Sequence, residues 1–269
     1  MISNYHTIFR CIPFDASLSF RTGLTYRAAT ILRIVSNVFV TLVYIFLWLA
    51  LFQGKTEING FQKNEMIQYV IATRMLKLLY PYSVSDNYGS LIKSGKIFSW
   101  LLKPIPLEVH LLSQSIGTMG YNLCFYCTPA VCLLIAFIDL PSLKIAQYGV
   151  VIIWFASAYL FLFLLECCVG VISYYTTSLW GINQFKAAIL GFLAGELLPL
   201  SFYPSFFLNI FEKLPFVSVY YVPIAILLGK VNNFPLLEFC ILWGSILVLC
   251  EVYGFLRRRM QKHIMIQGG

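Results

Sequence analysis

Long apolar runs separated by short polar segments dominate the pattern of this chain. A transmembrane helix needs about 20 predominantly apolar residues. On that basis we expect six spans, at residues 28–52, 66–84, 109–138, 145–172, 182–203 and 234–256. The second span is the weakest, because it contains Arg74 and Lys77. The pattern therefore predicts an all-α integral membrane fold in which residues 1–269 form a single transmembrane domain.

The segment before the first span, residues 8–26, mixes apolar side chains with Arg10, Asp15 and Arg21. Such a segment can lie in the membrane interface with its apolar side in lipid. Proline breaks a helix interior, so we expect Pro13 to end any continuous helix and the helical part to begin near Phe14. An interfacial anchor is the first interpretation, and a docking site for a partner is the alternative. The charges also argue against a cleavable signal peptide.

Residues 88–103 form a two-faced segment between the second and third spans. At about 100° per residue, a helix here would present two sets of residues on opposite sides, one mainly apolar and one mainly basic. The first set is Leu91, Gly95, Phe98 and Leu102, and the second is Lys93, Lys96, Trp100 and Lys103. Pro104 and Pro106 are expected to end this helix. The helix could rest on anionic headgroups, or it could be a rigid lever on which a cytoplasmic partner pushes.

Residues 195–230 are too apolar for a solvated loop, yet Pro199, Pro204, Pro215 and Pro223 forbid one long helix. Short re-entrant half-helices over 205–230 satisfy both facts, provided that the protein buries their free backbone groups. They could form an exit-side gate or a purely structural cap. Glu196 is expected to cap the first re-entrant turn, since a carboxylate is favourable at a helix N-terminus.

The composition excludes other classes of protein. The chain is 59% hydrophobic and 11% charged, with a mean hydropathy of +0.80. A soluble domain carries about 25% charged residues, so neither a water-soluble globule nor a disordered chain fits. The net charge of +8 is attributed to the positive-inside bias of membrane insertion rather than to nucleic acid.

The distribution of Lys and Arg along the chain predicts the topology. With a cytoplasmic N-terminus, one side would hold most of these cations: Arg10, Arg21, Arg27, Arg33, Lys93, Lys96, Lys103, Lys186, Arg257, Arg258, Arg259 and Lys262. The external side would hold only Lys55, Lys63, Lys144, Lys213 and Lys230. We therefore expect both termini in the cytoplasm, in agreement with an even number of spans.

Ionisable groups inside the expected spans are the candidates for chemistry. Arg74 and Lys77 are three residues apart and share a helix face, which should contact protein or water because an unpaired cation in lipid is costly. His110 and Gln114 begin a polar stripe on the third span, and Glu166 is the clearest internal acid. One interpretation is a structural ion pair of Arg74 or Lys77 with Glu166. The other is a pathway lining that favours an anionic or amphipathic substrate.

No metal site or ATP site is predicted for this chain. Cys124 and Cys127 have the spacing of a metal clip, but no second pair completes it. The sequence contains no GxxxxGK[ST] phosphate loop, so we expect it not to be an enzyme that hydrolyses ATP by that route.

Two of these segments resemble a known family. Gly95-Lys-Ile followed by Leu101-Leu-Lys103-Pro104 is similar to the cytoplasmic loop of type-2 ABC (ATP-binding-cassette) exporter permeases. The runs at 195–204 (GELLPLSFYP), 214–216 (LPF), 221–223 (YVP) and 228–230 (LGK) look like the signature of a bacterial six-span subfamily. Tyr203 stands where Phe is usual, and Lys103 where Arg is also found.

The resemblance implies a permease in the bacterial cytoplasmic membrane that moves a substrate outward. It implies a dimer with a second permease, either another copy or a related paralogue, and two copies of a cytoplasmic ATPase that bind ATP and Mg. Residues 88–103 would be the helix that couples to this ATPase, and 205–230 the re-entrant exit-side helices. A non-transporting subunit of a sensory or immunity complex, and a secondary carrier, remain alternatives. The substrate could be a drug, peptide, lipid or polysaccharide.

Overall fold

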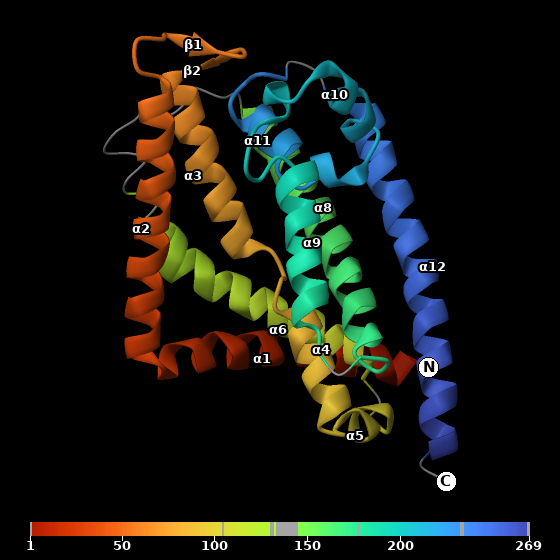
Figure 1. Ribbon diagram of the computed structural model, residues 1–269. Coiled ribbons are helices and arrows are strands. Elements are labelled where there is room, and N and C mark those ends of the chain that lie inside the picture. Colours follow the sequence, from red (N-terminus) through yellow and green to blue (C-terminus); the bar gives the residue numbers. More distant parts are fainter. Residues whose placement is uncertain are drawn as a thin grey trace.

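The protein is almost entirely helical, as its apolar pattern predicted (Figure 1). The computed structural model describes residues 2–103, 105–129, 132, 145–176, 178–231 and 234–267. In chain order the elements are α1 (Ile2–Thr25), α2 (Arg27–Leu51), β1 (Glu57–Ile58), β2 (Phe61–Gln62), α3 (Lys63–Leu79), α4 (Val84–Lys93), α5 (Ile97–Leu101), α6 (Leu107–Asn122), the π-helix η1 (Leu123–Cys127), α8 (Ile145–Ile172), α9 (Trp180–Leu193), the 3-10 turn η2 (Leu200–Phe202), α10 (Ser205–Phe211), the 3-10 turn η3 (Pro215–Ser218), α11 (Tyr221–Leu227) and α12 (Leu236–Gln267).

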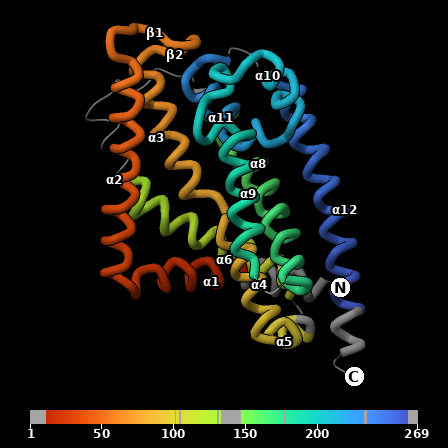
Figure 2. Tube along the Cα trace, in the orientation of Figure 1, coloured from red at the N-terminus to blue at the C-terminus, as the bar shows by residue number. Residues whose placement is uncertain are grey.

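The helical bundle has two ends, which can be followed along the chain trace (Figure 2). The β1–β2 hairpin, α10 and α11 lie at one end, which we call the hairpin end. The helix α5 and both termini lie at the other, which we call the α5 end, and α1 lies across the bundle there. The long helices α2, α8 and α12 connect the two ends.

In the described part of the chain, three helices are long and apolar enough to cross a membrane. These segments are Arg27–Leu51, Gln147–Ile172 and Leu236–Lys262. The helices α3 and α9 have 17 and 14 residues, or about 26 and 21 Å at 1.5 Å per residue, which is less than a hydrocarbon core of about 30 Å. The expected third span begins as α6 and continues into η1. Its end at 130–138 lies, except for Cys132, outside the described residues, so six spans remain a prediction.

The prediction that Pro13 would end the N-terminal helix is wrong. The helix α1 runs from Ile2 to Thr25 with Pro13 inside it. It packs along α6, where a Cβ on Gly117 would lie only 2.1 Å from the carbonyl oxygen of Ala16. This close backbone approach gives α1 tertiary contacts that offset the hydrogen bond lost at the proline.

The segment 88–103 is not one helix, in contrast to the expectation. It comprises the end of α4, a turn at Gly95 with φ of +70°, and the short α5. The turn changes which side chains share a face, so Trp100 is partly buried against the protein while Lys93, Lys96 and Lys103 are exposed. Trp100 stacks on His110 with 4.1 Å between ring centroids, while Phe98 and Leu102 are 48% and 89% exposed.

The segment 205–230 forms short helical elements, as its prolines predicted. Pro204 immediately precedes α10, and Pro215 is the first residue of η3. Proline is tolerated there because the amide of a first helical residue has no partner within the helix. Protein groups satisfy part of the remaining backbone: Trp154 Nε1 donates to the carbonyl of Ser218 at 3.0 Å, and the Tyr221 amide donates to the carbonyl of Ala194 at 3.1 Å. Insertion of these elements into the outer leaflet remains a prediction.

Candidate functional site

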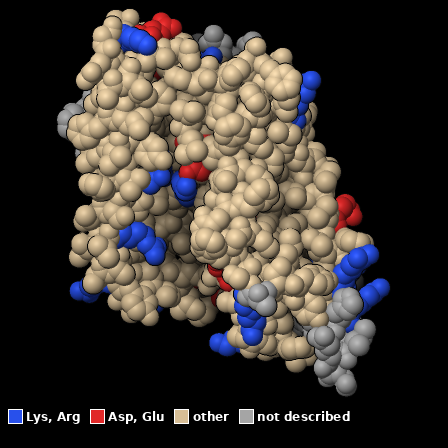
Figure 3. Space-filling model, viewed as in Figure 1, with Lys and Arg blue, Asp and Glu red and all other residues tan. Residues whose placement is uncertain are grey.

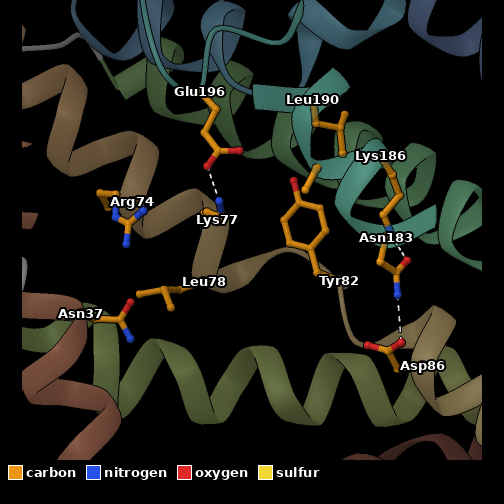
Figure 4. Close-up of a pocket in the computed structure, with 11 residues that line it drawn as sticks. Asn37, Arg74, Lys77, Leu78, Tyr82, Asp86, Asn183, Lys186, Leu190 and Glu196 are labelled. Carbon is orange, nitrogen blue, oxygen red and sulfur yellow. Dashed lines mark hydrogen bonds and ion pairs between the residues drawn. The ribbon is translucent and has the colours of Figure 1, made fainter. Parts of the chain in front are cut away.

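A cavity of about 380 Å³ lies between α3 and α9 (Figure 4). It is lined by Asn37 of α2, by Arg74, Lys77 and Leu78 of α3, by Tyr82 and Asp86, by Asn183, Lys186, Ala187 and Leu190 of α9, and by Glu196. Both cations that the sequence placed inside the second span therefore line it. They share a side of α3 because residues three apart are neighbours on a helix surface.

Lys77 forms an ion pair with Glu196 across this cavity (Figure 4). The expected pairing of Lys77 or Arg74 with Glu166 is therefore wrong, because Glu196 binds Lys77 and Glu166 has another partner. Glu196 also does not act as the expected helix cap. Its carboxylate is 8% exposed and the Lys77 side chain is 41% exposed, so the pair lies at the edge of the protein interior.

The backbone before Glu196 is fixed by a tight contact with α3. Gly195 has a φ of +81°, and its carbonyl accepts a hydrogen bond of 2.5 Å from the Tyr69 hydroxyl. A Cβ at this position would lie 2.9 Å from that hydroxyl oxygen. Glycine avoids both the strain of the left-handed conformation and this clash, and thereby lets Glu196 reach the cavity.

Glu166 of α8 is fully buried, at 0% exposed, and pairs with Lys186 of α9. The Lys186 ammonium lies 2.5 Å from Glu166 Oε1, and the backbone amide of Ser85 donates to Oε2 at 3.3 Å. The Lys186 side chain is only 10% exposed. The topology estimate counted Lys186 simply as a cytoplasmic cation, whereas it is a buried partner of the internal acid.

The same network continues from α9 to α4. The Lys186 ammonium donates to Asn183 Oδ1 at 3.0 Å, and Asn183 Nδ2 donates to Asp86 Oδ1 at 2.9 Å (Figure 4). This chain of contacts joins α8, α9 and the first turn of α4. Asp86 of α4 and Lys186 of α9 both line the cavity, so this network connects α4 to the cavity wall.

Arg74 differs from the two lysines. Within the described residues, no carboxylate lies in ion-pair contact with its guanidinium, and it lies 5.7 Å from the centroid of the Tyr44 ring. The cavity lining thus holds three cations, Arg74, Lys77 and Lys186, and two carboxylates, Asp86 and Glu196. With Glu166, the partner of Lys186, the carboxylates also number three, and among these described groups Arg74 is the cation and Asp86 the carboxylate outside the two ion pairs.

The cavity narrows toward the hairpin end. A second pocket of only about 10 Å³ shares Arg74 and Glu196 with it and extends to Trp48 and Val70. Tyr82, which lines the larger cavity, has its hydroxyl hydrogen bonded to that of the buried Tyr220 at 2.7 Å. Figure 3 shows the corresponding surface, where blue and red atoms lie in a hollow near the middle of the face, while further charged residues lie toward its edges.

His110 and Gln114 do not belong to this site. They line a separate cavity of about 330 Å³ between α1 and α6. His110 Nδ1 lies 2.7 Å from Asp15 Oδ2, and Gln114 Oε1 accepts from Asn87 Nδ2 at 3.4 Å. The grouping of this polar stripe with Arg74 and Lys77 is therefore wrong.

Sequence reasoning missed the α9 side of the site. Asn183 and Lys186 are three residues apart within an apolar run, which is the same signal that identified Arg74 and Lys77. Tyr82 and Asp86 carry no comparable signal, because Tyr82 falls between α3 and α4 and Asp86, in the first turn of α4, lies outside the expected spans.

The residues expected to couple to an ATPase are mostly on the surface of the α5 end. Lys93, Gly95, Lys96 and Lys103 are exposed along with Phe98 and Leu102, whereas Leu91 and Trp100 are partly buried against a core cluster. Lys103 lies 3.5 Å above the Trp100 ring. Their role in coupling stays a prediction.

Comparison with known proteins places most of the chain in one family. Residues 38–260 match the family described as ABC-2 family transporter protein. A search of curated proteins found no match. The resemblance drawn from the coupling segment and the proline-rich segment is thereby confirmed at the level of the family. The chain belongs to the ABC-2 family of transporter proteins and is a membrane protein of that family.

Proposed function

We propose that this chain is the permease subunit of an ATP-driven exporter, which moves a substrate from the cytoplasm or inner leaflet outward. Membership of the ABC-2 family supports a transport role. The sequence lacks a GxxxxGK[ST] loop, so ATP and Mg would be bound by a separate ATPase subunit. The partners would be two copies of that ATPase and a second permease, either another copy of this chain or a paralogue.

The observation that carries this proposal is the cavity that narrows beside the Lys77–Glu196 pair. Alternating access requires a site that is closed toward one side while it is open to the other. Here Tyr82 and Tyr220 meet at the hairpin side of the site, and Tyr69 holds the backbone of Gly195. With the α5 end in the cytoplasm, as the cation distribution predicts, and in the bacterial membrane that the resemblance implies, this geometry would correspond to a permease closed on its exit side.

The α5 end supplies a surface that a cytoplasmic ATPase could hold. Phe98 and Leu102 are exposed apolar side chains among exposed lysines, a combination suited to a groove with apolar and acidic walls. The adjoining α4 is closely packed on α8, where a Cβ on Gly170 would lie 2.6 Å from Cβ of Tyr88. Motion of this segment would reach the cavity through the contacts from Asp86 to Lys186.

Copurification from the native membrane tests the proposal. We expect tagged wild-type protein to retain an ABC ATPase and to show ATP turnover that depends on the permease. We expect Leu102→Asp to lose the ATPase while its own elution in detergent is unchanged, because a residue that is 89% exposed contributes little to folding. Thr56→Asp, an exposed position at the hairpin end, is the matched control and should retain the ATPase. If the wild-type protein binds no ATPase, or if Leu102→Asp behaves as Thr56→Asp does, the proposed coupling is refuted.

A further inference from the structure

The cavity between α3 and α9 has the size of a small-ligand site. Its volume of about 380 Å³ falls at the lower end of the range of about 300–1,000 Å³ for pockets that bind small molecules. That volume accommodates a polar headgroup with the first part of a hydrocarbon chain. The adjoining pocket of about 10 Å³ is too small to admit either, so a ligand would be held on the α5 side of the constriction.

The charged groups of the lining differ in what remains available to a ligand. Lys77 is bound by Glu196, and Lys186 is bound by Glu166. Asp86 accepts a hydrogen bond from Asn183. The guanidinium of Arg74 is the cation without a carboxylate partner among the described residues of the lining.

An unpaired cation among transmembrane helices is unfavourable, and such residues commonly mark substrate pathways. The guanidinium presents a rigid fork of N–H donors that matches a carboxylate or phosphate with two parallel hydrogen bonds. Arg74 thus provides the chemistry that recognises an acidic group.

The rest of the lining is suited to a hydrocarbon. Leu78 lies next to Arg74 on α3, and Ala187 and Leu190 lie opposite on α9. Figure 4 shows Leu78 on the same side as Arg74 and Leu190 across the cavity from it. A free inorganic anion would leave these apolar side chains without a partner, whereas an amphiphile would cover them.

From these observations we propose that the cavity binds an amphiphile with an acidic headgroup, that Arg74 binds the acid, and that the apolar wall receives the chain. The proposal rests on the proposed function in one respect only, namely that this amphiphile would be the transported substrate. Binding itself requires neither ATP nor an ATPase, so it can be measured separately from transport.

The test uses full-length protein in a neutral maltoside detergent and radiolabelled dodecyl phosphate, measured by scintillation proximity. We expect saturable binding that excess unlabelled dodecyl phosphate displaces. Dodecyltrimethylammonium, which has the same chain and the opposite charge, should compete at least tenfold less well. Inorganic phosphate, which has the acid and no chain, should also compete at least tenfold less well. Equal competition by either compound would overturn the proposal.

Substitutions at Arg74 test whether this side chain forms the binding site. We expect Arg74→Gln to weaken binding by about tenfold or more, as the loss of a charge-assisted hydrogen bond implies, and Arg74→Lys to restore part of it. The matched control is Arg33→Gln, since Arg33 also lies beside an aromatic ring, that of Tyr126, but lines the other cavity. Unchanged binding in Arg74→Gln, or an equal loss in Arg33→Gln, would overturn the assignment. These results do not depend on copurification of an ATPase, so the binding proposal and the proposed function can fail independently.

Discussion

The buried pair of Glu166 and Lys186 yields the sharpest stability prediction. Glu166 is 0% exposed and the Lys186 side chain is 10% exposed. Two unit charges about 4 Å apart interact by about 4 kcal/mol at an effective dielectric constant of about 20. Removing one member also leaves the other charge buried without a partner, and this loss typically costs about 3–5 kcal/mol.

We therefore predict that Lys186→Met lowers the free energy of unfolding by about 3 kcal/mol. The lower part of the range is expected because the Ser85 amide still donates to the Glu166 carboxylate at 3.3 Å. The double variant Glu166→Gln/Lys186→Met should recover about 2 kcal/mol of that loss, since it removes the unpaired charge. The measurement is reversible unfolding by SDS in mixed micelles, followed by helical circular dichroism.

The matched control is Lys77→Met, because Lys77 also pairs with a glutamate at the same cavity but is 41% exposed. Water reaches the Lys77 side of this pair, whereas the Glu196 carboxylate is only 8% exposed, so this variant should lose about 1–2 kcal/mol, clearly less than Lys186→Met. If Lys186→Met and Lys77→Met are equally stable, burial does not determine how much each ion pair contributes to the free energy of unfolding. If the double variant is no more stable than Lys186→Met, the isolated charge is not the cause of the loss. Either result would refute the reasoning.

Two glycine substitutions test other parts of the fold. Gly117→Ala should lower the free energy of unfolding by about 1–3 kcal/mol in the same SDS titration, because its Cβ would meet the Ala16 carbonyl at 2.1 Å; Gly120→Ala, whose nearest contact would be at 3.8 Å, is the control and should lose clearly less. Gly95→Ala should lower the free energy of unfolding by about 1 kcal/mol through its left-handed backbone alone, since nothing lies within 4 Å of its Cβ. It should also reduce permease-dependent ATP turnover without lowering expression. Unchanged turnover would show that the turn between α4 and α5 has no part in coupling.

The general class of the fold could be predicted from the sequence because it depends on local properties. Apolar runs identified the helices that connect the two ends, and prolines at 199, 204 and 215 predicted the short elements of the hairpin end. Two helices were nevertheless misjudged. Pro13 is tolerated in α1 because of packing on α6, and Gly95 separates α4 from α5 although both lie in one amphipathic pattern. In each case a tertiary contact or a single backbone angle overrides the periodicity.

Only the α3 side of the site could be predicted from the sequence. Spacing along α3 showed that Arg74 and Lys77 share a face, and both line the cavity. Spacing carries no information about which distant carboxylate approaches that face. Glu196 is brought there by the left-handed turn at Gly195, and Glu166 is directed to Lys186 by the packing of α8, α9 and α4. Such pairings depend on the relative positions of helices, which a single sequence does not contain.

The two ion pairs of the cavity differ in burial, and this difference separates a structural role from a switching one. The Glu166–Lys186 pair is enclosed, so breaking it would expose an uncompensated charge to the protein interior. The Lys77–Glu196 pair lies at the constriction, and its lysine is half-exposed. Because water reaches its ammonium, a conformational change could open this pair at a lower cost than the enclosed one. The acidic group that we propose at Arg74 would arrive one helical turn from Lys77 and would compete with Glu196 for its ammonium. Ligand binding would then weaken the Lys77–Glu196 contact, which in the exporter that we propose links occupancy of the cavity to its opening.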